Sequence, residues 1–543
     1  MKKIKKRKIL VTCALPYANG LIHLGHIMEH IQADIWVRFH RMLNNKIWFI
    51  CSGDTHGTAI MLKCKKEKIK PKIYVKKIIK EQKDIFLKFN ISHDNYYSTH
   101  TKEHLYYVNK LFLILKKKKL INKKTIYQWF DSKFNIFLPD RLVLGTCPIC
   151  RSNKQYGDNC ESCGSVYSAL DLIKPISVLS NTKPILKNSV HLFFNLPYFT
   201  NMLKNWTASD VLQKTVYNKI KEWLLKGLKE WDISRDAPYF GFKIPFYTNK
   251  YFYVWFDAPI GYISSFKNLC DKNKNINFKK FWVKSSNYEL YHFIGKDIIY
   301  FHSLFWPAVL HGCDFKKPTK IFAHGYVLFN GCKMSKSRGV NITAKNWLKY
   351  FDSDSLRYYY ASKLSNGIED IDINIKQFIN KINSDLLNKI VNLASRSAKI
   401  INVRFNSFLS TKIEDIDLYN YFLKISNNII YNFNKLNFNI VISEIIELAN
   451  LANKYINDKK PWTYKEKFYF DNKIHRIFSM GINFFKIIMT CLKPITPILA
   501  QNSEIFLKIS LLWENINQPL LNHKISIYKN LYQKINENIK YNF

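Results

Sequence analysis

Two Cys-x-x-Cys pairs stand close together in the segment CPICRSNKQYGDNCESC, residues 147–163, with nine residues between the pairs. Four thiolates at this spacing can close around one metal ion in a tetrahedral site, and zinc is the expected ion. Because the protein fills all four positions, none is left for water or substrate, so we predict a structural site. Two disulfides or four unconnected thiols are the alternative, but the other seven of the 11 cysteines show no pairing pattern. The predicted ligands are Cys147, Cys150, Cys160 and Cys163.

The chain has 543 residues, which is too long for one hydrophobic core and predicts about three or four domains of ~150 residues each. The basic start MKKIKKRK is not followed by the apolar core of a signal peptide, because Thr12, Pro16 and Gly20 interrupt the next stretch. No apolar run approaches the ~18 residues of a membrane helix. We therefore expect a cytoplasmic protein with reduced cysteines and no membrane partner.

The net charge is +44, from 84 Lys and Arg against 40 Asp and Glu. Such an excess favours a nucleic-acid partner, because neutralising phosphates dominates that kind of affinity. The excess is mostly Lys, however, and it accompanies abundant Ile, Asn, Phe and Tyr along the whole chain, as an AT-rich coding sequence would produce by drift. Both explanations stay open from composition alone.

The N-terminal stretch has the pattern of a strand, a turn and a helix. ILVTCALP at 9–16 reads as a buried strand, YANG as the turn, and the residues from Leu21 onward carry apolar side chains at helical spacing. KIWFICSGDTHG predicts a second strand with Asp54 and His56 at its carboxyl end, where α/β sheets bind ligands. From about residue 376 the pattern changes to long amphipathic helices with few Gly or Pro, which predicts a helical bundle.

The sequence HLGH places His23 and His26 three residues apart at the start of the predicted helix, so both project to one side. Imidazoles beside the positive end of a helix can donate hydrogen bonds to phosphate oxygens, and Gly25 between them leaves room for a flat base or a ribose. A pair of surface or helix-capping histidines is the alternative for this motif taken alone.

A second motif is NGCKMSKSRG at 330–339, in which Lys333 and Lys336 lie between Gly331 and Gly339. It can form a mobile loop that brings two ammonium groups onto a polyphosphate, or a solvated basic turn. The chain contains neither the Gly-rich dinucleotide fingerprint nor a P-loop, so ATP would have to be held in another way.

In this order, the two motifs resemble the paired His-x-Gly-His and Lys-Met-Ser-Lys-Ser signatures of class I aminoacyl-tRNA synthetases. Further segments are similar to the methionyl-tRNA synthetases of the bacterial type, and the resemblance extends from Ile9 to the C-terminal helices. These segments are CALPYANG (13–20), WDISRDAPYFG (231–241), YVWFDAPIGY (253–262), FIGKDI (293–298) and FHSLFWPA (301–308).

The resemblance implies an α/β fold: a doubly wound parallel nucleotide-binding (Rossmann-like) sheet, split by an insertion with a zinc knuckle and followed by an α-helical anticodon-binding bundle. The expected domains are the first half of the catalytic fold (1–117), the connective insertion (118–250, with its knuckle at 145–166), the second half (251–325), the KMSKS stem-contact region (326–388) and the anticodon-binding domain (389–543).

The resemblance also implies a methionine–tRNA ligase that activates L-methionine with ATP and Mg²⁺ and transfers it to the 3′ end of initiator and elongator tRNA(Met). By resemblance, Asp54 holds the methionine ammonium group. The side-chain pocket would be lined by Ala14, Leu15, Tyr17, Trp255, Pro259, Tyr262 and His302. The expected ATP contacts are His23, Gly25, His26, Gly295, Asp297, His324 and Lys336, and the expected catalytic residues are His23, His26, Lys333 and Lys336.

The family places anticodon recognition in the helical bundle, at positions that correspond to Asn392, Arg396 and Trp462. Asn392 and Arg396 are four residues apart and so share a helical face, and an aromatic ring such as Trp462 can stack on a base. The chain ends soon after the bundle, from which we expect a monomer. A cysteinyl or isoleucyl enzyme of the same class is the nearest rival, and a non-catalytic zinc-containing RNA chaperone is a rival of a different kind.

Overall fold

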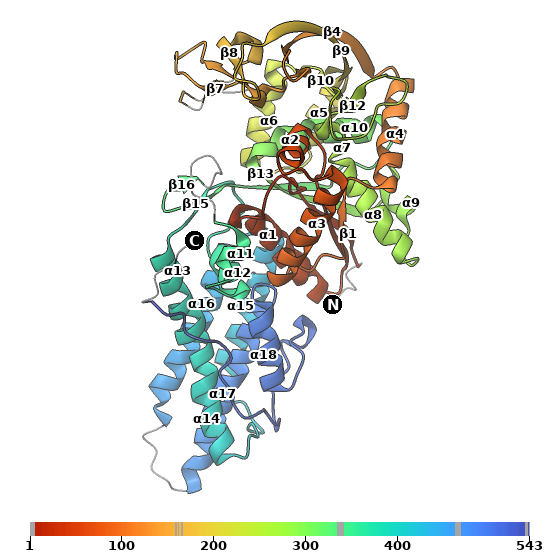
Figure 1. Ribbon diagram of the computed structural model, residues 1–543. Coiled ribbons are helices and arrows are strands. Elements are labelled where there is room, and N and C mark those ends of the chain that lie inside the picture. Colours follow the sequence, from red (N-terminus) through yellow and green to blue (C-terminus); the bar gives the residue numbers. More distant parts are fainter. Residues whose placement is uncertain are drawn as a thin grey trace.

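The computed structural model describes residues 6–157, 160, 162–163, 165, 167–333, 342–461, 468–537 and 541. Three parts follow one another along an elongated molecule (Figure 1). A β-rich insertion lies at one end, a parallel sheet with its helices lies in the middle, and long helices form the other end.

The middle part is built on a five-stranded sheet in the order β14-β13-β1-β2-β3, with every neighbouring pair parallel. The strands are β1 (Lys8–Cys13), β2 (Lys46–Gly53), β3 (Asn95–Ser98), β13 (Glu289–Gly295) and β14 (Lys320–His324). Strands β1, β2 and β3 are neighbours both in the chain and in the sheet, whereas β13 and β14 come after the insertion in the chain and pair on the other side of β1. Because parallel strands point the same way, their carboxyl ends all meet at one edge.

Alternating side chains of β1 face two separate cores. Ile9 and Val11 pack into a core shared with the helix that follows β1, whereas Leu10 packs into a second core on the opposite face. Burial on both faces explains why the strand reads as a continuous apolar run, as is usual for parallel sheets. The strand ends at Cys13, earlier than the predicted Pro16, although the N–H group of Ala14 still bonds to the carbonyl of Phe293 on β13.

Helices cover both faces of the sheet. Those that precede the insertion are α1 (Leu24–Met42), α2 (Thr58–Lys66), α3 (Pro71–Lys88) and α4 (Lys102–Lys117). Those that follow it are α7 (Val254–Asp257), α8 (Ile260–Lys272), α9 (Phe278–Trp282), η4 (Lys296–Ile298), the π-helical turn η5 (Phe301–Phe305) and α10 (Trp306–Gly312). Helices α4 and α8 pack in the second core, opposite α1.

The insertion is made mostly of antiparallel strands, and its longest strands, β4 and β9, pair with each other (Figure 1). Its strands are β4 (Ile121–Asp131), β5 (Ile136–Phe137), β6 (Val143–Thr146), β7 (Gln155–Tyr156), β8 (Ile173–Ser177), β9 (Ile185–Phe194), β10 (Trp231–Asp232), β11 (Ser234–Asp236) and β12 (Lys250–Phe252). Its helices are η1 (Asp140–Leu142), η2 (Ala169–Asp171), η3 (Leu196–Phe199), α5 (Thr200–Thr207) and α6 (Lys214–Lys226).

A small connecting unit follows β14. It contains β15 (Val327–Phe329), β16 (Cys332–Lys333), α11 (Ala344–Trp347), α12 (Ser353–Ala361) and β17 (Ile371–Ile373). The antiparallel pair of β15 and β16 leads into the KMSKS segment, and β17 joins β15 in parallel.

The C-terminal helices form the predicted bundle (Figure 1). They are α13 (Ile375–Ile382), the π-helical turn η7 (Asn383–Val391), α14 (Asn392–Arg404), α15 (Ile416–Asn434), α16 (Phe438–Lys459), α17 (Phe468–Leu492), α18 (Pro497–Leu507) and η9 (Trp513–Asn515). Their apolar faces belong to the same core as α1, so the bundle packs directly on the catalytic sheet and its first helix.

A buried ion pair connects the bundle to α1. Arg357 of α12 has no exposed side-chain surface, and its Nη2 lies 2.7 Å from the Oδ2 of Asp34 on α1. The same guanidinium donates to the carbonyls of Ile495 and Pro494, between α17 and α18, at 2.7 and 3.0 Å. Asp34 also accepts from the N–H group of Ser92 at 2.7 Å. Arg357 therefore joins three segments that are far apart in the sequence.

No helix among the described residues combines the length and the apolarity that a bilayer-spanning segment requires.

His191 of β9 links the strands at the base of the insertion. Its Nδ1 lies 2.7 Å from an oxygen of Asp232, and its Nε2 lies 3.0 Å from an oxygen of Asp236. Carboxylates only accept hydrogen bonds, so both ring nitrogens carry protons and the ring is charged. Burial alone would lower the pKa of His191, but the hydrogen bonds to Asp232 and Asp236 raise it above its ordinary value.

We predict that His191→Gln destabilises the insertion in a pH-dependent way. A raised pKa contributes stability that is fully present below the pKa of an unfolded histidine, about 6.5, and is lost as the pH rises through the higher folded value. Charged hydrogen bonds of this kind contribute about 1.5–3 kcal/mol. The thermal midpoint of the variant should fall furthest below that of the wild type at pH 6, and the gap should narrow by pH 9. His311→Gln is the matched control, because burial lowers the pKa of His311, and an equal gap for His191→Gln at both pH values would contradict the prediction.

Candidate active site and cysteine cluster

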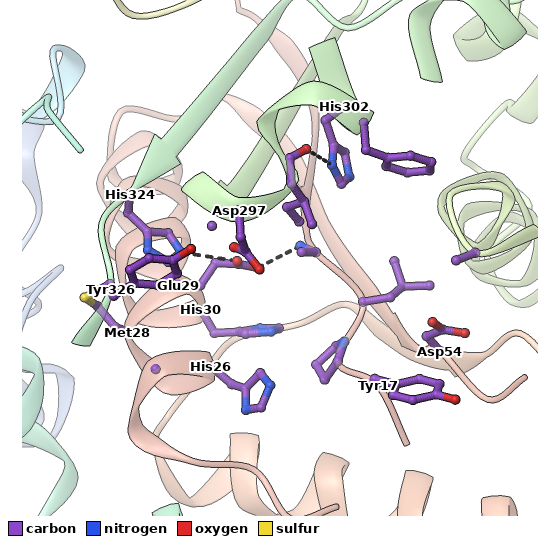
Figure 2. A pocket seen from close by; sticks show the side chains of 18 of the residues that line it. Tyr17, His26, Met28, Glu29, His30, Asp54, Asp297, His302, His324 and Tyr326 are labelled. Carbon is purple, nitrogen blue, oxygen red and sulfur yellow. Dashed lines mark hydrogen bonds and ion pairs between the residues drawn. The ribbon is translucent and has the colours of Figure 1, made fainter. Parts of the chain in front are cut away.

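A cavity of about 590 Å³ opens at the carboxyl edge of the parallel sheet. Its walls come from the ends of β1, β2, β13 and β14, from the first turns of α1, and from α7, α8 and η5. Figure 2 shows His26, Glu29 and His30 projecting from α1 on one side, and Tyr17 and Asp54 on the opposite side. The cavity therefore lies where α/β sheets ordinarily bind ligands.

The structure brings together every predicted substrate and nucleotide residue whose side chain it describes. The cavity is lined by Ala14, Leu15, Tyr17, His23, Gly25, His26, Asp54, Trp255, Pro259, Tyr262, Gly295, Asp297, His302 and His324. These residues come from segments that span the chain from β1 to β14, and they meet only because the strands of both halves share one sheet.

The HLGH motif forms the N-terminal cap of α1. The N–H group of Gly25 donates to Nδ1 of His23 at 3.1 Å, and the N–H group of His23 donates to Nδ1 of His26 at 3.3 Å. The two rings lie 3.7 Å apart. An Nδ1 that accepts a hydrogen bond leaves the proton of a neutral imidazole on Nε2. Helix capping was the alternative interpretation of this motif, and the structure shows such a cap. Because the cap uses Nδ1 of both rings as acceptors, Nε2 is the nitrogen of each ring that can donate.

The close packing of the cap favours glycine at position 25. A Cβ atom at this position would lie 3.0 Å from Cε1 and 3.1 Å from Nδ1 of His23. A side chain at position 25 would therefore push the His23 ring away from the backbone N–H group of Gly25, which donates to it. This is a second reason for glycine here, beside the predicted space for a base or ribose.

Asp54 follows β2 directly and carries an unpaired carboxylate oxygen. Its backbone N–H bonds to the carbonyl of Pro16 at 3.0 Å, which holds the loop after β1 beside it. Among the described residues its Oδ1 is buried and has no hydrogen-bond partner. Burial, and then the charge of Asp257, raise the pKa of Asp54 well above its ordinary value. A cationic ligand would supply the missing partner and favour the ionised form.

One wall of the cavity is largely apolar but contains a hydrogen-bonded pair. The Nδ1 of His302 donates to the carbonyl of Ile298 at 3.2 Å, so its Nε2 accepts from the hydroxyl of Tyr262 at 2.9 Å. Burial lowers the pKa of His302 to about 4, so the ring is neutral near pH 7. His302 lies in the π-helical turn η5, a type of irregularity that is frequent at functional sites.

The opposite end of the cavity contains a carboxylate that sequence reasoning missed. Glu29 accepts a hydrogen bond from the N–H group of Ala14 at 2.7 Å and lies 3.2 Å from Nε2 of His324. The Nδ1 of His324 donates to the carbonyl of Gly325 at 2.7 Å. Burial lowers the pKa of His324, but the bond to Glu29 raises it above its ordinary value, and burial raises the pKa of Glu29. Glu29 and His324 form a hydrogen-bonded pair. This pair connects β1, α1 and β14 around the nucleotide side of the cavity.

Gly295 and Asp297 lie next to this pair. A Cβ atom on Gly295 would come within 2.6 Å of an oxygen of Asp297, so glycine lets the Asp297 carboxylate approach the end of β13.

The sequence carried little signal for Glu29. Residues 26–34 of α1, HIMEHIQAD, contain five polar residues, so polarity alone does not single out Glu29 or its neighbour His30. Only the structure shows that both are buried, where polar groups need partners.

Three of the predicted positions cannot be placed by their side chains. Lys333 lies in β16, where its backbone pairs with Leu328 of β15, but its side chain lies outside the described part of the structure. Lys336 and Trp462 also lie outside the described residues. Asn392 and Arg396 are exposed on α14, and Nη2 of Arg396 donates to Asn457 at 2.9 Å.

The four predicted metal ligands come together at one point of the insertion. The Sγ atoms of Cys147 and Cys163 are 3.9 Å apart, those of Cys150 and Cys160 are 3.5 Å apart, and all four lie within 4.8 Å of one another. The cysteines form no disulfide. Four sulfurs around one zinc ion would be about 3.8 Å apart, given Zn–S bonds of about 2.3 Å. The arrangement can therefore hold a metal ion, and the predicted alternative of two disulfides is wrong.

Comparisons with known proteins identify the family. The family model described as tRNA synthetases class I (M) matches residues 9–398. A methionine–tRNA ligase of Buchnera aphidicola subsp. Schizaphis graminum is 58% identical over 532 residues, which cover 98% of this chain and 97% of the relative. The chain belongs to the methionine–tRNA ligases of class I. A methionine–tRNA ligase of Wigglesworthia glossinidia brevipalpis is 56% identical over 532 residues, with 98% and 97% coverage.

A solved structure has the same fold as this ligase. A Mycobacterium tuberculosis methionyl-tRNA synthetase bound by methionyl-adenylate matches with a TM-score of 0.81 at 21% identity, over 97% of this chain and 100% of that chain. The predicted fold class, a doubly wound parallel sheet split by an insertion and followed by a helical bundle, is confirmed. The family decides against the cysteinyl and isoleucyl enzymes and against a non-catalytic RNA chaperone.

Proposed function

We propose that the ligase activates methionine with ATP and transfers the methionyl group to the 3′ end of tRNA(Met), for initiation and elongation. The observation that carries this proposal is the Asp54 carboxylate, one oxygen of which has no hydrogen-bond partner among the described residues. Asp54 borders the same cavity as an apolar slot and two histidines at a helix N-terminus. An amino acid with a long apolar side chain can place its ammonium on Asp54, its side chain in the slot and its carboxylate toward those histidines.

Methionine suits the slot chemically. Aromatic faces attract a polarizable sulfur with contacts of about 0.3–1.5 kcal/mol. The Tyr262–His302 pair uses its own two protons in hydrogen bonds, so this wall can face an uncharged thioether without leaving a buried donor unpaired. The remaining walls of the methionine site are Ala14, Leu15, Tyr17, Trp255 and Pro259.

ATP is proposed to bind at the Glu29–His324 end of the cavity. Gly25, Gly295, Asp297 and His324 would contact the nucleoside, and the Nε2–H groups of His23 and His26 would donate to phosphate oxygens. Lys333 and Lys336 would bring positive charge to the β- and γ-phosphates. Magnesium would accompany ATP and neutralise phosphate charge, and because this ion binds largely through substrate phosphates, it needs no dedicated protein cage.

The proposed reaction has two steps. A carboxylate oxygen of methionine attacks the α-phosphorus of ATP, which forms methionyl-adenylate and releases pyrophosphate. A hydroxyl of the terminal adenosine of tRNA then attacks the acyl carbon, and AMP leaves. No side-chain nucleophile takes part, so catalysis rests on positioning and on hydrogen-bond donors at the developing charge.

The proposed activity predicts methionine-dependent exchange of labelled pyrophosphate into ATP, followed by charging of tRNA(Met). Isoleucine and cysteine should support no comparable exchange. Homocysteine, which lacks one methyl group, should be disfavoured by about 10- to 200-fold in kcat/KM. A preference for another amino acid would contradict the methionine assignment, and exchange with none of them would contradict the proposed activation step.

The role of His26 can be separated from its capping function. We predict that His26→Ala lowers the rate of adenylate formation by about 10²–10³, the usual loss for one transition-state donor. His26→Asn keeps an acceptor for the backbone N–H group of His23 but has no donor at the Nε2 position, so it should be equally slow in pyrophosphate exchange. Recovery of the rate in His26→Asn would mean that only the helix cap matters.

The helical bundle is proposed to read the anticodon through Asn392, Arg396 and Trp462. The first two are supported by their exposed positions on one face of α14. Stacking of an unpaired base on an aromatic ring contributes about 1–3 kcal/mol. The net charge of +44 would add an affinity for tRNA phosphates that weakens with salt.

We also propose that the ligase acts as a cytoplasmic monomer, with the domain boundaries given by the family resemblance.

Zinc is the proposed ion of the cysteine cluster, where it would fix the knuckle without touching substrate. The cluster supports this proposal because N–H groups of Ile149 and Cys150 donate to Sγ of Cys147, both at 3.4 Å, which stabilises a thiolate. No coordination position is left over for catalysis.

We predict about one zinc ion per chain, lost in Cys150→Ser and kept in the control Cys270→Ser. Metal analysis gives the stoichiometry, and limited proteolysis reports whether the insertion stays folded. Because folding of such modules depends on the ion, loss of zinc should make the insertion sensitive to protease before it affects pyrophosphate exchange. If chelation abolished exchange while the insertion stayed resistant, the ion would belong to the reaction instead.

A further inference from the structure

His30 is a third histidine on the face of α1 that borders the cavity. It follows His26 by four residues, so the two side chains lie one helical turn apart on the same side. Figure 2 shows the His30 ring extending from α1 into the region between His26 and Glu29. The side chain is 1% exposed and lines the cavity. None of the motifs discussed above includes it.

The Nε2 atom of His30 is buried and has no hydrogen-bond partner among the described residues. A buried polar atom without a partner costs about 1–3 kcal/mol, so its persistence at the wall of a binding cavity indicates that a ligand completes it. The opposite side of the His30 ring, in contrast, does contact neighbouring side chains.

These side chains are His93 and Phe86. The Nδ1 of His30 lies 3.0 Å from Nε2 of His93, and the His30 ring packs 4.0 Å from the ring of Phe86. Burial, and then the neighbouring His93, lower the pKa of His30 well below its ordinary value, and burial lowers that of His93 to about 3. Both rings are therefore neutral, and one proton lies between the two facing nitrogens.

If His93 supplies that proton, His30 has the same arrangement as His23 and His26. In those two residues an N–H group donates to Nδ1, which leaves the ring proton on Nε2. Three imidazole Nε2–H groups would then border one cavity. Donors suit the negative charges of a carboxylate and a phosphate, whereas an acceptor would repel them.

The position of His30 determines which group of the substrate it can contact. A nitrogen of His30, the sulfur of Cys13 and an oxygen of Glu29 lie within 4.8 Å of one another, and Glu29 is 2.7 Å from the N–H group of Ala14. His30 is therefore beside the end of β1, where the methionine slot begins. A methionine held at Asp54 must extend its carboxylate through this region to reach the α-phosphate. As a metal site the same group is unfavourable, because both oxygens of Glu29 already have partners.

We propose that Nε2–H of His30, oriented by His93, donates a hydrogen bond to the methionine carboxylate oxygen that does not attack phosphorus. This oxygen becomes the acyl carbonyl of methionyl-adenylate. The bond would turn the attacking oxygen toward ATP and stay in place during transfer, when the same carbonyl oxygen gains negative charge. The inference rests on the proposed function and adds to it a contact to one substrate atom.

The test compares two ligands that differ only at the carboxylate. Methionine is compared with its amino alcohol, methioninol, in which a CH₂OH group replaces the carboxylate while the ammonium and thioether remain. His30→Asn places an amide near the Nδ1 position and has nothing at Nε2, whereas His30→Gln can place an amide N–H near Nε2. We expect His30→Asn to weaken methionine binding by about 10- to 100-fold, the scale of a charged hydrogen bond, and methioninol binding by less than about twofold.

His30→Gln should recover part of the methionine affinity and part of the rate of adenylate formation. Equal weakening of methionine and methioninol in His30→Asn would show a merely structural role, and unchanged binding of both would show no role; either overturns the proposal. If both His30 variants fail to fold, His93→Asn decides: it leaves the His30 ring in place but has no group at the Nε2 position that faces Nδ1 of His30. A loss confined to methionine supports the contact, whereas no such loss overturns it. Wild-type pyrophosphate exchange is measured alongside, so a failure of the proposed function is seen separately.

Discussion

The ion pair between Asp34 and Arg357 fixes the helix on which the whole active site depends. Taking two such charges out of water costs several kcal/mol per ion, and further hydrogen bonds to backbone carbonyls and to Ser92 offset part of that cost. Burial would raise the pKa of Asp34, but Arg38 and Arg357 hold it well below its ordinary value, and the carboxylate stays ionised. Since Arg357 also bonds carbonyls at the α17–α18 turn, α1 cannot tilt relative to the bundle without breaking buried charged bonds.

This constraint matters because α1 contributes to the cavity over several turns. His23 and His26 cap its first turn, Glu29 and His30 follow in the next, and Asp34 lies beyond them. Glu29, His30 and Asp34 each bond to other segments of the chain, so the helix is held by its polar face as well as by its apolar one. The distance between the capping histidines and the ends of the strands is thereby fixed before any substrate enters.

Much of this arrangement could be predicted from the sequence, because motifs at strand ends and helix starts carry local information. Asp54 after β2 and His23 before α1 were placed correctly by the pattern of strand, turn and helix alone. The partners could not be placed, because they are remote: Glu29 meets His324 across 295 residues, and Arg357 meets Pro494 across 137. Such contacts depend on the order of the strands and on how the bundle packs, and neither leaves a periodic signal in the chain.

The unpaired groups of the cavity indicate where the missing interactions lie. Oδ1 of Asp54 and Nε2 of His30 are buried polar atoms without partners among the described residues, whereas Glu29 and His324 bond to one another. A free carboxylate at one end and a free imidazole nitrogen near the other match the ammonium and the carboxylate of one amino acid. In the proposed binding mode, a zwitterionic substrate would give both polar atoms a partner at once. An uncharged analogue would give neither atom a charged partner, so selection for the amino acid backbone would be separated from selection for its side chain in the apolar slot.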